Sequence, residues 1–387
     1  MDSDPAPSPN PAPVSALPTF GLDFGSIRSM VEYRFRLLDA YVDVNGLASF
    51  AVAQEPMKDK FQELLGDLAN HKLSAIIRQV SDKLVITIFP KPQLGKPRRI
   101  INLVLFLATV CTVSLASYLL VYNVDPRLMT TVFANTNLFY ETVFLSVAIL
   151  GIVAIHESGH VIANRRHKMD ATLPYFIPGI PGFLGPIGTF GAVISLRSPP
   201  GNKDQLFDLG FSGPVAGFVA TMVVAVIAYM TGPIITEQDA TKLIAANLLT
   251  YQGWPYSPLF MDLIGQVGLR TVPPGHVLIL TQLAFAATIG ALITFLNILP
   301  IWQLDGGHIA RAALGKKGHI ITAVVGFAIL IAVGYYGFAI LLIMVMVLSQ
   351  RPLEGVEPLD DVSPLSNSRK VMFVAAWVMF VLTLVIL

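Results

Sequence analysis

Long apolar segments dominate the chain from about residue 100 onward. About 20 consecutive apolar residues are enough to cross the hydrocarbon core of a bilayer. Four segments reach that length and a fifth is shorter but adequate: Ile100–Tyr122, Tyr140–Ala163, Leu206–Met230, Leu278–Leu299 and Val371–Leu387. Residues 320–348 exceed one untilted crossing, so they form either one tilted helix or a helical hairpin, and we expect the single helix. The pattern predicts a polytopic α-helical membrane protein with about six transmembrane helices.

The chain before residue 96 has a different pattern. Residues 1–20 contain six prolines and no apolar periodicity, which predicts a disordered tail. In residues 21–95, apolar residues recur at helical spacing within 56–70, and two strand-like segments follow at 73–80 and 84–89. We therefore divide the chain into a disordered tail (1–20), a small N-terminal soluble α+β domain (21–95) and a transmembrane domain (96–387).

A glycine- and proline-rich segment interrupts the helical pattern. Glycines recur every three residues from Gly179 to Gly191, with four prolines between Pro174 and Pro186. Such a run cannot form a spanning helix. Irregular backbone at membrane depth persists only where it is buried in protein or lines a wet cavity. We expect a re-entrant segment that ends in a β-strand at Thr189–Leu196; the alternative is a cytoplasmic surface loop.

Composition agrees with a membrane protein and argues against some other classes. Charged residues make up 13% of the chain, against about 25% in soluble domains. The net charge of +1 argues against nucleic acid as a partner. The single cysteine, Cys111, cannot form an internal disulfide. Asp2, Asp4 and the following prolines leave no basic or apolar signal region, so we expect no cleavable signal peptide.

Basic clusters orient the predicted helices. They lie at residues 96–99, 165–168 and 311–317, whereas Lys242 and Arg270 are the only lysine and arginine in residues 231–275. Basic flanks of membrane segments favour the cytoplasmic side. We therefore expect a multi-pass membrane protein whose N-terminal domain is cytoplasmic.

Residues 156–160 are His-Glu-Ser-Gly-His and lie within the second apolar segment. On a helix, His156 and His160 are one turn apart on the same face, so both can bind one metal ion. Glu157 stands beside the first histidine, where it can take a proton from water. His156 is about 13 Å along the helix from Arg165, which places the metal near the cytoplasmic side. The alternative is a buried histidine pair bonded to backbone carbonyls.

A hydrolytic zinc site needs a third protein ligand and leaves a position for water. Asp305, in Leu304-Asp305-Gly306, follows the fourth apolar segment on the same predicted side. The two glycines after it permit a sharp turn and a close backbone approach. A helix-capping role for Asp305 is the alternative, and His308 is a competing ligand.

Together, the His-Glu-Ser-Gly-His and Leu-Asp-Gly motifs closely resemble the site-2 proteases, the intramembrane zinc metalloproteases of peptidase family M50. The similarity covers about residues 96–350, and the soluble domain is similar to that of archaeal and plastid members. Further segments that resemble the family are Gly188–Ile194, Phe207–Gly210, Gly213–Gly217 and Asn297–Pro300.

The resemblance implies one zinc ion per chain, held by His156, His160 and Asp305, with Glu157 as general base. It also implies a membrane-anchored protein substrate that is cut in or near its transmembrane segment, within the lipid bilayer. Substrate contacts are expected from the strand and from one polar residue before the aspartate motif: Thr189, Phe190, Gly191, Ala192 and Asn297. A polar contact between helices is the alternative for Asn297.

Other classes fit the sequence less well. A membrane zinc transporter needs more ionisable groups along its spans than this chain provides. A di-iron hydroxylase needs about eight clustered histidines, and the chain has 7 in all. A catalytically inactive membrane scaffold would be expected to lack Glu157 or a metal ligand, and all of them are present.

Overall fold

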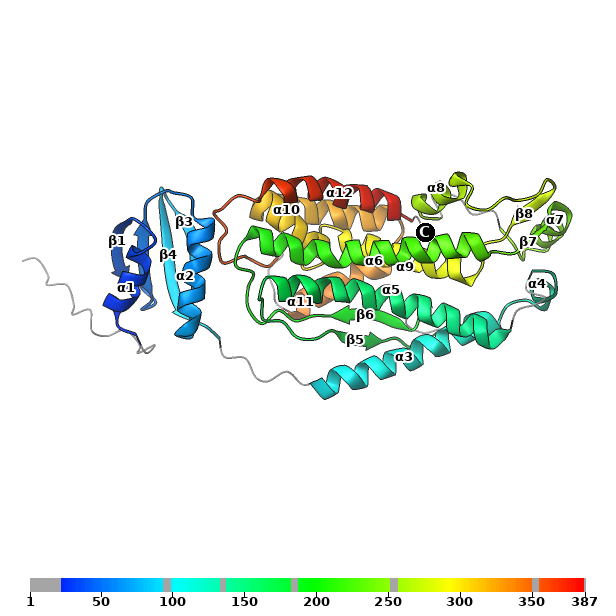
Figure 1. Ribbon diagram of the computed structural model, residues 1–387, viewed down its shortest axis with the longest axis horizontal. Coiled ribbons are helices and arrows are strands. Elements are labelled where there is room, and N and C mark those ends of the chain that lie inside the picture. The colour runs from blue at the N-terminus through cyan, green and yellow to red at the C-terminus, as the bar shows by residue number, and fades with distance from the viewer. Residues whose placement is uncertain are drawn as a thin grey trace, which may run out of the picture. The chain divides into compact units, whose positions relative to one another are not determined.

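The computed structural model describes residues 22–92, 99–132, 137–181, 187–250, 257–349 and 355–385 (Figure 1). The predicted tail at residues 1–20 lies outside these ranges. The chain separates into two compact units. The first comprises residues 1–94 together with 201–203 and 358–364, and the second holds the rest of the chain.

The first unit is a small α+β fold. Its antiparallel sheet has the order β1-β2-β4-β3, from Leu37–Val42, Ala48–Val52, Lys83–Pro90 and Leu73–Val80. Helices α1 (Phe24–Glu32) and α2 (Lys58–Asn70) pack against this sheet. Phe61, Leu64 and Leu68 of α2 are fully buried, because their spacing places them on one helix face.

Two short segments from far along the sequence belong to this first unit. The Ile77 N–H donates to the Leu359 carbonyl at 3.0 Å, and the Asp360 N–H donates to the Gly201 carbonyl at 3.0 Å. The Leu359 side chain joins the hydrophobic core of the sheet. Strand β3, an edge of the four-stranded sheet, is thereby partly paired.

The second unit is mostly helical. Among the described residues, four helices are long and apolar enough to cross a membrane: α3 (Arg99–Tyr122), α5 (Leu138–Arg166), α6 (Lys203–Thr231) and α10 (Asp305–Ala332). Two shorter apolar helices are α9 (Gln282–Ile298) and α11 (Tyr336–Ser349). Apart from a strand pair described below, the other elements are α4 (Pro126–Thr131), α7 (Glu237–Ala245), α8 (Leu259–Val267), α12 (Asn367–Thr383), and a β7–β8 pair, Ile234–Thr236 with His276–Leu278.

The prediction of a single helix over residues 320–348 is wrong. Helix α10 ends at Ala332 and α11 begins at Tyr336. Gly334 lies between them with φ +92°, a left-handed conformation that ends a helix and that glycine adopts without strain. The Tyr335 hydroxyl donates to the Val385 carbonyl at 3.2 Å, so the break is held in place.

The glycine-rich segment forms a hairpin beside α3. Strand β5 (Tyr175–Pro178) pairs antiparallel with β6 (Thr189–Val193). Regular pairing thus stops at Val193, three residues before the predicted end of the strand, while Leu196 forms a single bridge with Ala171. Of the predicted glycine series, Gly182 and Gly185 lie outside the described residues.

Gly188 anchors this hairpin on α3. Its φ is +71°, and a Cβ there would lie 2.4 Å from the Thr112 carbonyl oxygen. The Thr112 hydroxyl donates to the Gly188 carbonyl at 2.7 Å. Only glycine permits this close approach, so the spacing of glycines in the sequence has a steric cause at this position.

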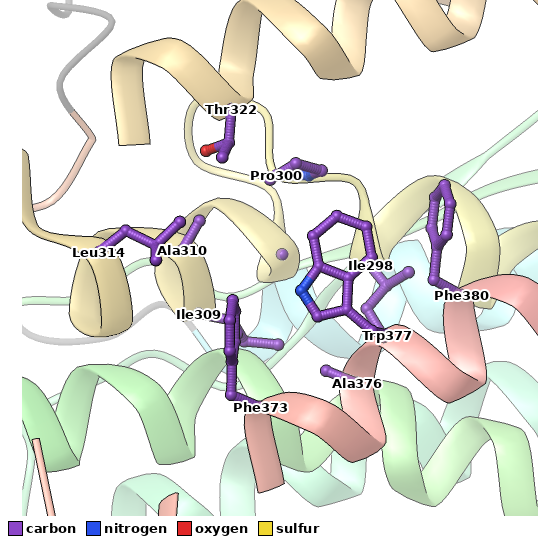
Figure 2. Close-up of a pocket in the computed structure, with 11 residues that line it drawn as sticks. Ile298, Pro300, Ile309, Ala310, Leu314, Thr322, Phe373, Ala376, Trp377 and Phe380 are labelled. Carbon is purple, nitrogen blue, oxygen red and sulfur yellow. The ribbon is translucent and has the colours of Figure 1, made fainter. Parts of the chain in front are cut away.

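Helix α12 packs against the turn that connects α9 to α10. Its residues Phe373, Trp377 and Phe380 surround a small apolar pocket whose other wall includes Ile298 and Ile309 (Figure 2). This apolar packing supports the start of α10, which is the position of Asp305.

Candidate metal centre

Helix α5 supplies two of the three predicted metal ligands. His156 and His160 are both buried, at 3% and 7% relative exposure, because their face of the helix turns into the bundle. Their Nε2 atoms are 3.3 Å apart. Successive turns of one helix therefore bring two imidazole nitrogens to the same point.

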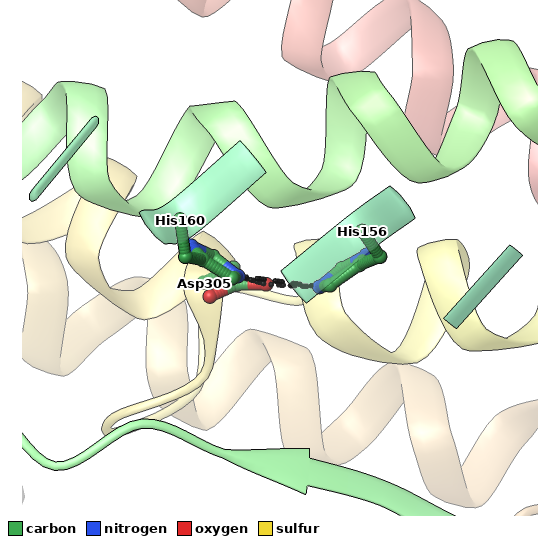
Figure 3. Close-up of side chains that lie close together, drawn as sticks. All are labelled: His156, His160 and Asp305. Atoms are coloured by element: carbon green, nitrogen blue, oxygen red, sulfur yellow. Dashed lines mark hydrogen bonds and ion pairs between the residues drawn. The ribbon is translucent and has the colours of Figure 1, made fainter. Parts of the chain in front are cut away.

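Asp305 is the first residue of α10, and its carboxylate reaches the same point. Its Oδ2 lies 3.2 Å from Nε2 of His156 and 3.3 Å from Nε2 of His160. Figure 3 shows both imidazoles directed toward the carboxylate between them. Two motifs that lie far apart in the sequence thus bring three side chains to one point.

The glycines after Asp305 permit its placement. A Cβ on Gly306 would lie 1.9 Å from the Ile298 carbonyl oxygen, and one on Gly307 would lie 2.2 Å from that of Trp302. The start of α10 therefore packs directly on the end of α9 and on the intervening turn. A side chain at either position would push Asp305 away from the histidines.

The three donor atoms fit a zinc ion. Ligands at about 2.05 Å from a tetrahedral zinc ion stand about 3.3 Å from one another. The observed separations of 3.2, 3.3 and 3.3 Å match this spacing. Two neutral imidazoles with the carboxylates of Asp305 and neighbouring Glu157 give a buried cluster that favours a divalent cation.

A backbone carbonyl of α6 fixes the orientation of His160. Its Nδ1 lies 2.8 Å from the Leu209 carbonyl oxygen, which only accepts hydrogen bonds. Nδ1 must therefore carry the proton, and Nε2 is left with its lone pair toward the metal position.

Helix α6 lies against both histidine rings through glycines. A Cβ on Gly213 would lie 2.1 Å from Nε2 of His160, and one on Gly217 would lie 2.9 Å from Nδ1 of His156. These glycines have no side chain that could contribute to catalysis. Their role is to let the backbone of α6 support the two imidazoles closely.

A cavity of about 220 Å³ opens at the three donors. Glu157 lines it, next to His156 and His160 and with only 7% exposure. Of the five predicted substrate-binding residues, Ala192 and Asn297 line this cavity.

The other three predicted substrate-binding residues have different surroundings. Thr189, Phe190 and Gly191 are not among the described residues that line the cavity. The Thr189 hydroxyl donates to the Ile177 carbonyl at 3.0 Å, which stabilises the hairpin. Phe190 is 47% exposed, on the outside of the unit.

The cavity has further lining residues besides the five predicted individually. Val193, Ile194 and Leu196 belong to the predicted substrate strand and extend its side of the wall, whereas Gln303 and His308 had not been predicted as substrate contacts. The sequence leaves His308 as the alternative to Asp305 for the third ligand. The structure places Asp305, rather than His308, within the group of three donor atoms.

The comparisons with known proteins agree with this geometry. The profile described as Peptidase family M50 matches residues 144–343, which include both motifs. The chain is 26% identical over 269 residues to the probable zinc metalloprotease EGY2, chloroplastic, of Oryza sativa subsp. indica, covering 69% of this chain and 46% of that protein. No solved structure matches the chain significantly.

Two further relatives match over shorter regions. The probable zinc metalloprotease EGY1, chloroplastic, of Arabidopsis thaliana is 30% identical over 175 residues, 44% of this chain and 30% of that protein. The probable zinc metallopeptidase EGY3, chloroplastic, of Arabidopsis thaliana is 25% identical over 173 residues, 43% of this chain and 29% of that protein. The chain thus spans less than half of the length of these curated relatives.

Proposed function

The chain belongs to peptidase family M50, and from this premise we propose that it is an intramembrane zinc metalloprotease. It hydrolyses a peptide bond in or near a transmembrane segment of a membrane-anchored protein. The observation that carries the proposal is the triangle of two imidazole nitrogens and one carboxylate oxygen at tetrahedral spacing, with Glu157 lining the same cavity.

His156, His160 and Asp305 hold the zinc ion, one per chain. Bound zinc supplies Lewis acidity toward the scissile carbonyl and toward water. Glu157 accepts a proton from the attacking water at a carboxylate oxygen, and it then donates that proton to the departing amide nitrogen. Burial of Glu157 among apolar helices keeps this proton transfer away from bulk water.

The substrate is held as an extended strand beside β6. A transmembrane helix hides its carbonyl groups in its own hydrogen bonds, so it must unwind before water can reach a peptide bond. Ala192 and Ile194 line the cavity at the end of β6, and strand addition there keeps the substrate extended. The Asn297 side chain, which also lines the cavity, hydrogen-bonds the substrate backbone.

Thr189, Phe190 and Gly191 contribute through the strand rather than through the cavity wall. They form the first part of β6, which pairs with β5 on one edge. Its other edge provides backbone groups for the substrate.

In this proposal the α3, α5, α6, α9 and α12 segments each cross the membrane, and the α10–α11 segment enters it and returns as a hairpin. The hairpin follows because residues 201–203, before α6, and residues 358–364, before α12, belong to the same N-terminal unit. The basic clusters at 165–168 and 311–317 place their ends of the bundle in the cytoplasm, together with the N-terminal unit and the zinc-binding side. The predicted cluster at 96–99 lies mostly outside the described residues.

Removal and return of the metal test this function. The purified full chain in detergent is incubated with a single-span protein substrate, and the products are sequenced by mass spectrometry. A chelator abolishes cleavage, zinc restores it, and the new terminus lies in or near the transmembrane segment. Cleavage that continues in metal-free protein, or that falls only in soluble parts of the substrate, would contradict the proposal.

A further inference from the structure

A second polar cavity lies between α5, α6 and α12, apart from the metal centre. Its volume is about 520 Å³. On each of the three helices, a charged or hydroxyl residue at the helix end lines the cavity, and an apolar residue about one turn deeper lines it as well. The pairs are Arg166 with Ile162, Asp208 with Phe211, and Ser368 with Met372.

Hydrogen bonds and ion pairs connect the residues at the polar end of this cavity. Asp208 accepts a hydrogen bond from Nε of Arg369 at 2.7 Å, and its Oδ2 lies 2.7 Å from Nε2 of His167. The Arg369 guanidinium also pairs with Asp204, at 3.1 Å. These contacts join all three helix ends and neutralise the one carboxylate that lines the cavity.

Arg166 supplies a cation at the rim of the cavity. It is exposed, and it has no ion pair with any residue in the described part of the chain. Arg369 is already paired with Asp204 and Asp208, so Arg166 is the cation of the described lining that is left for a ligand. A phosphate bound here meets an arginine fork and the Ser368 hydroxyl, which are the donors that phosphate oxygens accept.

The deeper end of the cavity is apolar and exposed, since Ile162 is 65% exposed and Met372 is 41% exposed. Helix α5 is long and apolar enough to cross a membrane, and in the proposed topology α12 crosses beside it, so this end faces lipid. A molecule that fills both ends therefore has an anionic group followed by a hydrocarbon chain. Basic pockets between membrane helices near their ends are suited to acidic headgroups.

We propose that this cavity binds an acidic phospholipid, with its headgroup phosphate at Arg166 and Ser368 and an acyl chain over Ile162 and Met372. The positive charge of Arg166 repels the quaternary amine of a choline headgroup, so the site selects acidic over zwitterionic lipid. This inference is independent of the proposed protease activity.

Lipid retention by purified full-length protein tests the proposal. The protein is incorporated into nanodiscs that contain equal amounts of phosphatidylglycerol and phosphatidylcholine. Lipids that stay bound after transfer to detergent are counted by native mass spectrometry. A phosphatidylglycerol with a photoreactive acyl chain maps the position of the bound lipid.

Matched variants separate the cavity from general surface charge. Arg166→Gln is compared with Arg165→Gln, since Arg165 is a neighbour that is also exposed but does not line the cavity. Ser368→Glu, which adds a repelling carboxylate, is compared with Asn367→Glu. All four positions are exposed, so the variants are expected to fold.

The expected result is one retained phosphatidylglycerol per chain, crosslinked near Ile162 or Met372. Retention falls about tenfold in Arg166→Gln and Ser368→Glu, the size expected for losing a charge-assisted contact. Arg165→Gln and Asn367→Glu retain lipid as the unaltered protein does. An equal loss in both members of each pair, or preference for phosphatidylcholine, would overturn the proposal. Displacement of the lipid by millimolar inorganic phosphate alone would assign the site to free phosphate instead.

Discussion

At the scale of single residues, the candidate metal centre depends on glycines as well as on the side chains that would bind the metal. The meeting of the two proposed ligands on α5 was predictable, because two histidines four residues apart share a helix face. The contacts that hold the two imidazoles in place were not predictable, because they come from the backbone of α6. A carbonyl such as that of Leu209 has no signature in the sequence, and the contacts of Gly213 become visible only when two helices are packed together.

Substitution of Gly213 tests this steric support. In Gly213→Ala, the new Cβ meets the His160 ring at 2.1 Å, so the ring must move away from the metal position. We expect zinc affinity to fall by at least about tenfold, the lower end of the effect of disturbing groups that orient a ligand. Zinc content is measured by atomic spectroscopy of the purified protein. Gly151→Ala on α5 is the control, since nothing lies within 4 Å of its Cβ, and equal zinc loss in both variants would contradict the account.

The third ligand is tested by a pair of variants in the same turn. Asp305→Ala removes the oxygen that lies 3.2 Å from His156, so zinc occupancy drops. His308→Ala, three residues later, keeps all three donors and retains zinc, although it too lines the cavity. Both proteins are checked for retained helical content by circular dichroism. The reverse order of zinc loss would make His308 the ligand.

At the scale of elements, the length of an apolar segment predicted where helices form better than where a helix is interrupted. The segment predicted at Ile100–Tyr122 corresponds to α3, Arg99–Tyr122, because a continuous apolar run has few alternatives in a membrane. The break between α10 and α11 was missed. It depends on the backbone conformation of Gly334 and on a hydrogen bond of Tyr335 to a residue 50 positions away.

The strand that lines the cavity gives a prediction at this scale. Proline at Ile194 removes a backbone N–H donor and is poorly tolerated where strands pair. Proteolysis by Ile194→Pro is therefore expected to fall sharply while zinc content is unchanged. Ile194→Ala keeps the donor and retains more activity. Cleavage of a single-span substrate is followed by gel; equal activity of the two variants would mean that the segment does not hold substrate as a strand.

At the scale of the whole molecule, the N-terminal unit is not a contiguous piece of sequence. Residues 201–203 and 358–364 belong to it, although a pattern-based boundary at residue 95 excludes both. Periodicity detects strands and helices along one stretch of chain, whereas pairing of β3 with a distant segment depends on the tertiary fold.

Leu359 provides a test of this composite unit. Leu359→Ala removes a buried core side chain, and such truncations cost about 2–5 kcal/mol. We expect faster hydrogen exchange at the Ile77 amide, which donates to the Leu359 carbonyl, and along β3. Val80→Ala on the same strand is the control, because Val80 is 56% exposed. Unchanged exchange in Leu359→Ala would show that this segment does not stabilise the sheet.

The central claim is that Glu157 and a zinc ion together hydrolyse a peptide bond within this site, and Glu157→Gln tests it most directly. Glutamine keeps the size of the side chain but cannot act as a base, and general-base catalysis contributes typically about 10²–10⁴-fold. Zinc content and the cleavage rate of a single-span substrate are measured on the same preparation. The account predicts full zinc occupancy with cleavage reduced by at least about 100-fold. Near-normal cleavage by the zinc-loaded Glu157→Gln protein would contradict it.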